Sequence, residues 1–152
     1  MQLPIKNIYI YSAMRGLKDD APVCLYVIED DVTKEIKAYR RIFDSPMTGN
    51  QLALSAALAA LNRLERRSEV HLYTDSIYLV GPVRNGWLKD WKRNGWKNAK
   101  EKPVANCDLW KQIYALTERH VLSVEYNESS SVYMWMKWRM EDVDNRGDKG
   151  NA

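Results

Sequence analysis

Short apolar runs rich in Ile, Tyr and Val alternate with polar links over the first third of the chain, a pattern typical of β-strands. The runs predicted to be strands are residues 6–14, 22–29 and 34–43. Because only short polar links separate them, such as Asp30-Asp31, the three strands should form an antiparallel meander.

Residues 45–67 carry a different pattern, with Leu at helical intervals and Ala filling most of the gaps. This pattern predicts a helix that begins at the capping sequence Thr48-Gly49-Asn50. The apolar run that follows, residues 69–73, is predicted to be a strand. Because a helix separates this strand from the meander, we expect it to lie parallel to one of the earlier strands.

The second half of the chain is predicted to be mainly helical. Helices are expected over residues 76–83 and 86–94, from a cap at 106 or 108 through 120, and over 132–143, with a fifth strand at 121–126 and a loop at 97–103. The first of these helices should be capped by Asp75 or Ser76 and stopped by Gly81-Pro82.

The length of 152 residues fits one domain with a substantial core. We expect this single domain to cover residues 1–144 and the polar residues 145–152 to form a disordered tail. No apolar run approaches the roughly 20 residues that cross a bilayer, and no signal peptide is recognisable, so a cytoplasmic protein with no membrane partner is expected. Cys24 and Cys107 are far apart and should be free thiols.

Positive charge is concentrated in one segment. The net charge is only +3, but residues 84–102 hold seven Lys and Arg against Asp90 and Glu101, a local charge of +5 that leaves about −2 elsewhere. Tryptophans are interleaved with these basic residues. A basic patch on a nearly neutral body is typical of a protein that binds nucleic-acid phosphates. The alternative is a solvated basic loop with no partner.

Specific motifs accompany this basic segment: Thr74-Asp75-Ser76, Trp91-Lys92, Gly95-Trp96-Lys97, Lys102-Pro103-Val104 and Asp108-Leu109-Trp110. On these motifs the chain resembles the type 1 ribonuclease H family, in its bacterial form with a basic protrusion. The resemblance implies an α/β fold with a five-stranded mixed sheet flanked by helices. It also implies cleavage of the RNA strand of RNA–DNA hybrids by two divalent metal ions, usually Mg²⁺, held by four acidic residues.

The family's four acidic positions are mostly lost in this chain. Asp75 matches one of them, whereas Ser12 and Ala53 stand at two others. At the fourth, an ungapped alignment places Met140, and a small shift would bring in Asp142. Asp75 alone is a weak metal ligand, and the capping of a helix is sufficient to explain it. We therefore predict a degenerate catalytic site with no required cofactor, or Mg²⁺ or Mn²⁺ if residual activity exists.

The residues that the family uses for binding are better preserved. The predicted nucleic-acid-binding residues are Thr48, Asn50, Trp87, Lys89, Trp91, Lys92, Arg93, Trp96, Lys97, Lys100 and Lys102. Trp91 and Trp110 are expected to lie mostly in the core, and Trp87 is expected to be more exposed. The interpretation favoured by the sequence is a degenerate ribonuclease H-like protein that binds hybrid or duplex nucleic acid without sequence preference.

Two alternatives stay open. The first is a weakly active ribonuclease H that uses Asp75 with Asp142 or Asp144. The second is a protein-interaction module, because the last predicted helix is apolar on more than one side. In that case a protein partner or a second copy would contact Tyr133, Trp135 and Trp138.

Overall fold

The computed structural model describes residues 2–13 and 21–145, with only the backbone of residues 142–145. Five strands form one sheet: β1 (Ile5–Tyr11), β2 (Val23–Asp30), β3 (Ile36–Ile42), β4 (Glu69–Thr74) and β5 (Val121–Tyr126). Five helices accompany the sheet: α1 (Gly49–Leu61), α2 (Ile77–Arg84), α3 (Trp87–Arg93), α4 (Cys107–Arg119) and α5 (Ser131–Asn145). The described part contains no helix long and apolar enough to cross a membrane.

The sheet is mixed, as the sequence predicts, with the strand order β3-β2-β1-β4-β5. β1, β2 and β3 form the antiparallel meander, while β4 pairs in parallel with both β1 and β5. In the parallel register Ile10 lies opposite Thr74. The residues that follow β1 and β4 therefore emerge side by side at one end of the sheet, at the centre of the molecule.

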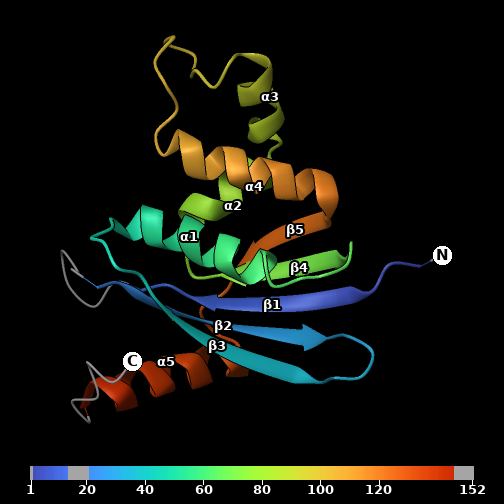
Figure 1. Ribbon diagram of the computed structural model, residues 1–152, viewed down its shortest axis with the longest axis vertical. Helices are drawn as coiled ribbons and strands as arrows, with labels where there is room; N and C mark the ends of the chain where they lie inside the picture. Colours follow the sequence, from blue (N-terminus) through green and yellow to red (C-terminus); the bar gives the residue numbers. More distant parts are fainter. Residues whose placement is uncertain (1, 14–20, 146–152) are drawn as a thin grey trace.

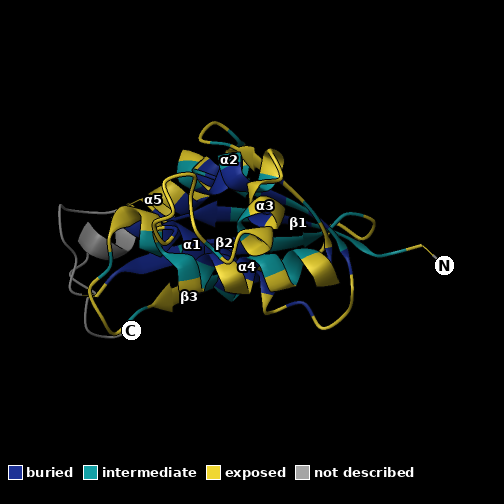
Figure 2. Cartoon of the chain, turned by 90° about the horizontal axis from the view of Figure 1, so that it is seen from above, coloured by how far each residue is buried: buried dark blue, intermediate teal, exposed yellow. Residues whose placement is uncertain are grey.

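Helices cover the two faces of the sheet unequally. α1, α2 and α4 lie on one face, with α3 projecting beyond them, and α5 lies alone on the other (Figure 1). The main hydrophobic core is between the sheet and α1, and it includes the side chains of Ile8, Leu52 and Trp110. A second, smaller cluster lies under α5. Buried residues concentrate in α1 and in the central strands, whereas α3 is mostly exposed (Figure 2).

The helix α1 begins as predicted but ends earlier. Thr48 is its N-cap, and a reciprocal capping box joins the Thr48 hydroxyl to the backbone N–H of Gln51 and the Gln51 side chain to the backbone N–H of Thr48. The helix ends at Leu61 instead of residue 67. The capping sequence determines the start of this helix, whereas no comparable signal marks its end.

Other boundaries differ from the predictions as well: β1 ends at Tyr11 instead of residue 14, and β3 covers Ile36–Ile42 instead of residues 34–43. Gly81-Pro82 does not stop α2, which continues to Arg84. A proline inside a helix removes one backbone hydrogen bond and crowds the carbonyl four residues earlier, but the side chain of Pro82 is buried within α2 and the helix continues past it. α5 runs to Asn145, one residue into the predicted tail. The remainder of that tail, residues 146–152, lies outside the described residues.

Candidate functional site

The site at the end of the central strands is built around Asp75. This aspartate follows Thr74, the last residue of β4, and Ser12 follows Tyr11, the last residue of β1. The Ser12 hydroxyl donates to Asp75 Oδ1 at 2.7 Å, and the Ser12 backbone N–H donates to Oδ2 at 2.9 Å. From α5, the Tyr133 hydroxyl donates to Oδ2 at 3.2 Å. Three neutral donors from two other segments therefore surround the carboxylate.

The environment of Asp75 favours its neutral form more than water does. Burial raises the pKa of Asp75, and the hydrogen bonds from Ser12 and Tyr133 only partly oppose this effect. Burial also raises the pKa of the Tyr133 phenol, and the negative charge of Asp75 is the second largest cause of this increase. Ser12 and Tyr133 are themselves buried. The half-buried carboxylate thus accepts hydrogen bonds from hydroxyl groups of two buried side chains, and the raised pKa of Tyr133 keeps its phenol protonated.

The interpretation of Asp75 as a helix cap is wrong. The N-cap of α2 is Ser76, and the helix start has no side-chain capping bond. The Asp75 side chain turns toward β1 and α5 instead. The sequence could not reveal this, because its partners Ser12 and Tyr133 are 63 and 58 residues away along the chain.

The other positions that the family fills with acids carry no described carboxylate. Ala53 is buried in α1, with 1% of its surface exposed, and Met140 is a residue of α5 whose side chain is buried against the sheet. Glu141 is exposed, and the side chain of Asp142 lies outside the described residues. Within the described part of the chain, no three His, Cys, Asp or Glu side chains are grouped closely enough to hold a metal ion. A pair of divalent ions needs several pooled carboxylates, so the described residues do not fit a two-metal centre.

The two histidines serve structural contacts elsewhere. His71 Nε2 lies 2.7 Å from Glu69 Oε2 on the same strand. His120 is buried and accepts a hydrogen bond from the backbone N–H of Ser68 at Nδ1. Burial, with nearby arginine charge, lowers the pKa of His120. Neither imidazole contacts Asp75.

A protrusion, residues 86–106, consists of α3 and the loop that follows it. Aromatic contacts attach it to α4: Trp91 packs edge-on against Trp110 with ring centroids 5.7 Å apart, and Trp96 packs against Tyr114 at 6.1 Å. Trp110 is fully buried and Trp91 is half-buried, whereas Trp87 is 46% exposed. The predicted division of the tryptophans between core and surface is therefore confirmed for these three residues.

The basic side chains of the protrusion are all exposed: Lys89, Lys92, Arg93, Lys97, Lys100 and Lys102. Two of them have acidic neighbours, since Lys92 lies 3.9 Å from Glu118 and Arg93 lies 3.7 Å from Asp90. The other four form no ion pair with any described residue. The ammonium of Lys111 in α4 lies 6.0 Å from the centre of the Trp96 ring and extends the basic surface. Lys111 was not among the predicted nucleic-acid-binding residues, because it lies outside the basic segment of residues 84–102.

A polar chain connects the start of α1 to the base of the protrusion. Gln51 donates to Asn106 Oδ1 at 3.4 Å, and Asn106 Nδ2 donates to the Tyr78 hydroxyl at 3.1 Å. The indole N–H of Trp110 donates to the same hydroxyl at 3.2 Å. This chain fixes the exposed Thr48 and Asn50 relative to the protrusion. The Thr-x-x-Gln capping box was the signal that could have pointed to Gln51.

The aromatic residues of α5 separate into two groups. Trp135 and Trp138 are 44% and 57% exposed. Tyr133 is buried and packs with Tyr11, Met136 and Met140 against the sheet. Placing Tyr133 on a partner-binding surface is therefore wrong, because its side chain is committed to the interior and to Asp75. Trp135 and Trp138 stay available at the surface.

Comparisons with known proteins identify the class that this fold and site define. The sequence profile of RNase H matches residues 12–129. The ribonuclease H of Chlorobaculum parvum is 47% identical over 87 residues, which are 57% of this chain and 57% of that protein. Ribonuclease HI of Neisseria meningitidis is 38% identical over 104 residues, 68% of this chain and 70% of that protein. The chain belongs to the ribonuclease H family.

Solved structures share the fold. A type 1 ribonuclease H described as having the type 2 active-site motif, LC9-RNase H1, superposes with a TM-score of 0.69 at 18% identity, covering 90% of this chain and 70% of that chain. LC11-RNase H1, solved in complex with an RNA/DNA hybrid, gives a TM-score of 0.60 at 16% identity and covers 80% of this chain and 84% of that chain. The matched segments span 57–61% of several of the curated relatives, including those from Chlorobaculum parvum and Chlorobium luteolum.

Proposed function

We propose that this protein binds nucleic acid through its protrusion and that its hydrolytic centre is lost. The observation that carries the proposal is the set of contacts around Asp75. Both carboxylate oxygens accept hydrogen bonds from Ser12, and Tyr133 adds a third donor. These three bonds occupy three of the about four lone-pair sites of the carboxylate, which leaves it little capacity to bind a metal ion.

The chemistry of phosphodiester hydrolysis supports the loss of activity. Two metal ions about 4 Å apart must be held by pooled negative charge to stabilise the attacking and leaving oxygens. Ser12 offers a neutral hydroxyl, and Ala53 offers no ligand at all. A single half-buried carboxylate with a raised pKa supplies too little charge for this task. Mg²⁺ or Mn²⁺ is therefore not a required cofactor in this proposal.

Binding is supported by the exposure and the charge of the protrusion. Lys89, Lys97, Lys100 and Lys102, which form no ion pair with a described residue, can neutralise phosphates and release counterions, which gives affinity without sequence preference. The half-exposed Trp87 offers a flat surface for a sugar or a base. A related fold, LC11-RNase H1, has been solved with an RNA/DNA hybrid, which makes hybrid or duplex the first ligand to test. The two free cysteines suit a reducing compartment such as the cytoplasm.

The test combines binding with cleavage. Fluorescence anisotropy with a labelled RNA–DNA hybrid, over a series of salt concentrations, should give a steep fall in affinity. The triple variant Lys97→Ala/Lys100→Ala/Lys102→Ala should bind more weakly, with a slope of log K against log[salt] reduced by about 0.9 for each phosphate that is no longer neutralised. Lys137→Ala, a change of an exposed lysine on α5, is the matched control. Equal slopes for both variants would refute binding through the protrusion.

The alternative, a weakly active ribonuclease H, rests on the retained Asp75 and on family membership. Incubation of the hybrid with Mg²⁺ or Mn²⁺ distinguishes the two. RNA cleavage by the wild type that disappears in Asp75→Asn would establish this alternative and reject the loss of activity. A hybrid that is retarded on a gel but uncut by either protein is the outcome that we expect.

A further inference from the structure

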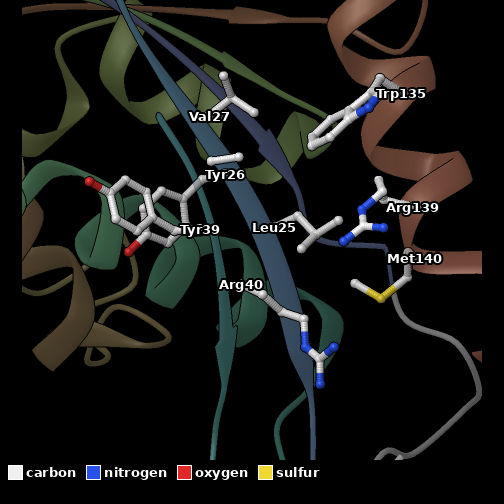
Figure 3. Close-up of a pocket in the computed structure, with 9 residues that line it drawn as sticks. Leu25, Tyr26, Val27, Tyr39, Arg40, Trp135, Arg139 and Met140 are labelled. Carbon is white, nitrogen blue, oxygen red and sulfur yellow. The ribbon is translucent and has the colours of Figure 1, made fainter. Parts of the chain in front are cut away.

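A groove of about 120 Å³ lies between α5 and the outer strands, on the face of the sheet opposite α1. Leu25, Val27 and Met140 form an apolar floor, and Trp135 forms one wall. Figure 3 shows Trp135, Arg139 and Met140 reaching from α5 toward Leu25 and Val27, while Tyr26 and Tyr39 point to the other side of the sheet. Two further apolar side chains of α5, Trp138 and Met134, are exposed.

The apolar surface continues onto β3, which is an edge strand. In the antiparallel register Ala38 lies opposite Val27 and Ile42 lies opposite Val23, so both point toward the α5 side of the sheet. Ile36 is on that side too and is 53% exposed. An edge strand with an apolar exposed face is a site where another chain can add a strand.

The charges around the groove are all positive. Arg40 of β3 and Arg139 of α5 line it, and none of the described residues lining it is acidic. Neither arginine forms an ion pair with a described carboxylate. The strand β3 itself, with the sequence IKAYRRI, carries three positive charges and no negative one.

We infer that the groove and β3 form a docking surface for an extended segment of another protein in which carboxylates alternate with apolar side chains. An apolar side chain of that segment fills the floor beside Trp135, and its carboxylates pair with Arg40 and Arg139. Arginine and tryptophan are the residues that most often dominate the energy of such interfaces. A bidentate carboxylate–guanidinium pair also gives directional specificity.

Charge excludes the two simpler occupants. A second copy paired along β3 would bring Lys37, Arg40 and Arg41 of one strand close to those of the other, and like charges across strands are destabilising. Nucleic acid needs a run of cations spaced along a phosphate backbone. Here two guanidinium groups, of Arg40 and Arg139, lie beside an apolar cleft with the exposed Trp135 at its wall.

The experiment is selection from a phage-displayed library of random 12-residue peptides against the immobilised wild-type protein. We expect enrichment of peptides that combine Asp or Glu with Leu, Ile, Phe or Trp. The enriched peptide is then synthesised with a fluorophore and its affinity measured by polarisation. Arg40→Ala/Arg139→Ala and Trp135→Ala should each weaken binding at least tenfold. Arg67→Ala, a change of an exposed arginine away from the groove, should leave it unchanged.

Four outcomes would overturn the inference. No enrichment of acidic–apolar peptides, or affinity that the groove variants do not alter, removes the docking surface. A concentration-dependent dimer in sedimentation that Trp135→Ala abolishes would assign the surface to a second copy. Competition between the peptide and the RNA–DNA hybrid would assign it to nucleic acid. Circular dichroism of each variant checks folding, and hybrid binding by the groove variants tests the proposed function independently.

Discussion

Replacing Tyr133 with Phe removes one hydroxyl from the Asp75 site and changes little else. The Tyr133 ring packs against Tyr11, with centroids 5.3 Å apart, and a phenylalanine ring can keep this contact. The hydroxyl donates to a partly buried carboxylate at 3.2 Å. A hydrogen bond to a charged group contributes about 1.5–3 kcal/mol. Because this bond is the longest of the three to Asp75, we expect a loss near the lower end, about 1.5 kcal/mol.

The loss should depend on pH in a defined direction. Burial raises the pKa of Asp75, so the folded state binds its proton more tightly than the unfolded chain does. The stability contributed by this tighter binding is present at low pH and declines as the pH rises through the folded pKa. Tyr133→Phe removes a donor that favours the charged form and raises that pKa further. The deficit of the variant should therefore be largest at neutral pH and smaller in acid.

Urea unfolding at pH 7 and at pH 4.5, followed by circular dichroism, measures both effects. Asp75→Asn provides the second arm of a double-mutant cycle, which isolates the Tyr133–Asp75 interaction. If Tyr133→Phe destabilises the Asp75→Asn protein as much as it destabilises the wild type, the hydroxyl does not act through the carboxylate. That result would also remove the main support for a lost metal site.

Three further predictions concern single residues. Ser12→Asp places a second carboxylate beside Asp75, so the variant should be less stable at pH 7. Millimolar Mg²⁺ or Mn²⁺ should restore its melting temperature, because a cation that binds the two carboxylates stabilises the folded state. An unchanged melting temperature would mean that the pair cannot bind a cation. Trp110→Ala should lower the free energy of unfolding by about 3–5 kcal/mol because its ring is buried, whereas Trp87→Ala should lower it by under about 1 kcal/mol. Equal losses in denaturant unfolding would contradict the assigned packing. The pKa of Asp30 is lowered to about 2, first by the Thr33 N–H and then by Lys6. The stability that the Asp30 carboxylate contributes is present above its unfolded pKa and is lost as the pH falls from about 4 to about 2. In Asp30→Asn, the free energy of unfolding should therefore depend less steeply on pH over this range.

Local patterns in the sequence were sufficient for most of the fold. Four of the five strands are largely apolar, whereas β3 carries three positive charges. The short links predicted the antiparallel meander, and the helix before β4 predicted its parallel placement. Boundaries were predictable where a side chain makes a local bond, as at the Thr48 capping box. They were not predictable at Pro82, whose side chain is buried within α2 and past which the helix continues.

The site was less predictable, because its contacts join distant segments. The sequence identified Ser12, Ala53 and Asp75 as the positions that matter, but it offered a helix cap as the role of the aspartate. The hydrogen bond from Tyr133 depends on where α5 crosses the sheet, and no local pattern specifies that crossing. Tyr133 was wrongly predicted to lie at a partner-binding surface for the same reason, because its burial depends on tertiary structure.

The helix α5 has a core of its own, separate from the main one. Its buried side chains pack only with the smaller cluster on their face of the sheet. Cooperative units with few buried contacts open at lower free energy than the whole protein. The amides of α5 should therefore exchange with solvent through a partial opening in which the rest of the sheet stays folded. In that open form Asp75 would lose Tyr133 and meet water, so the C-terminal helix determines how much of the time this carboxylate is shielded.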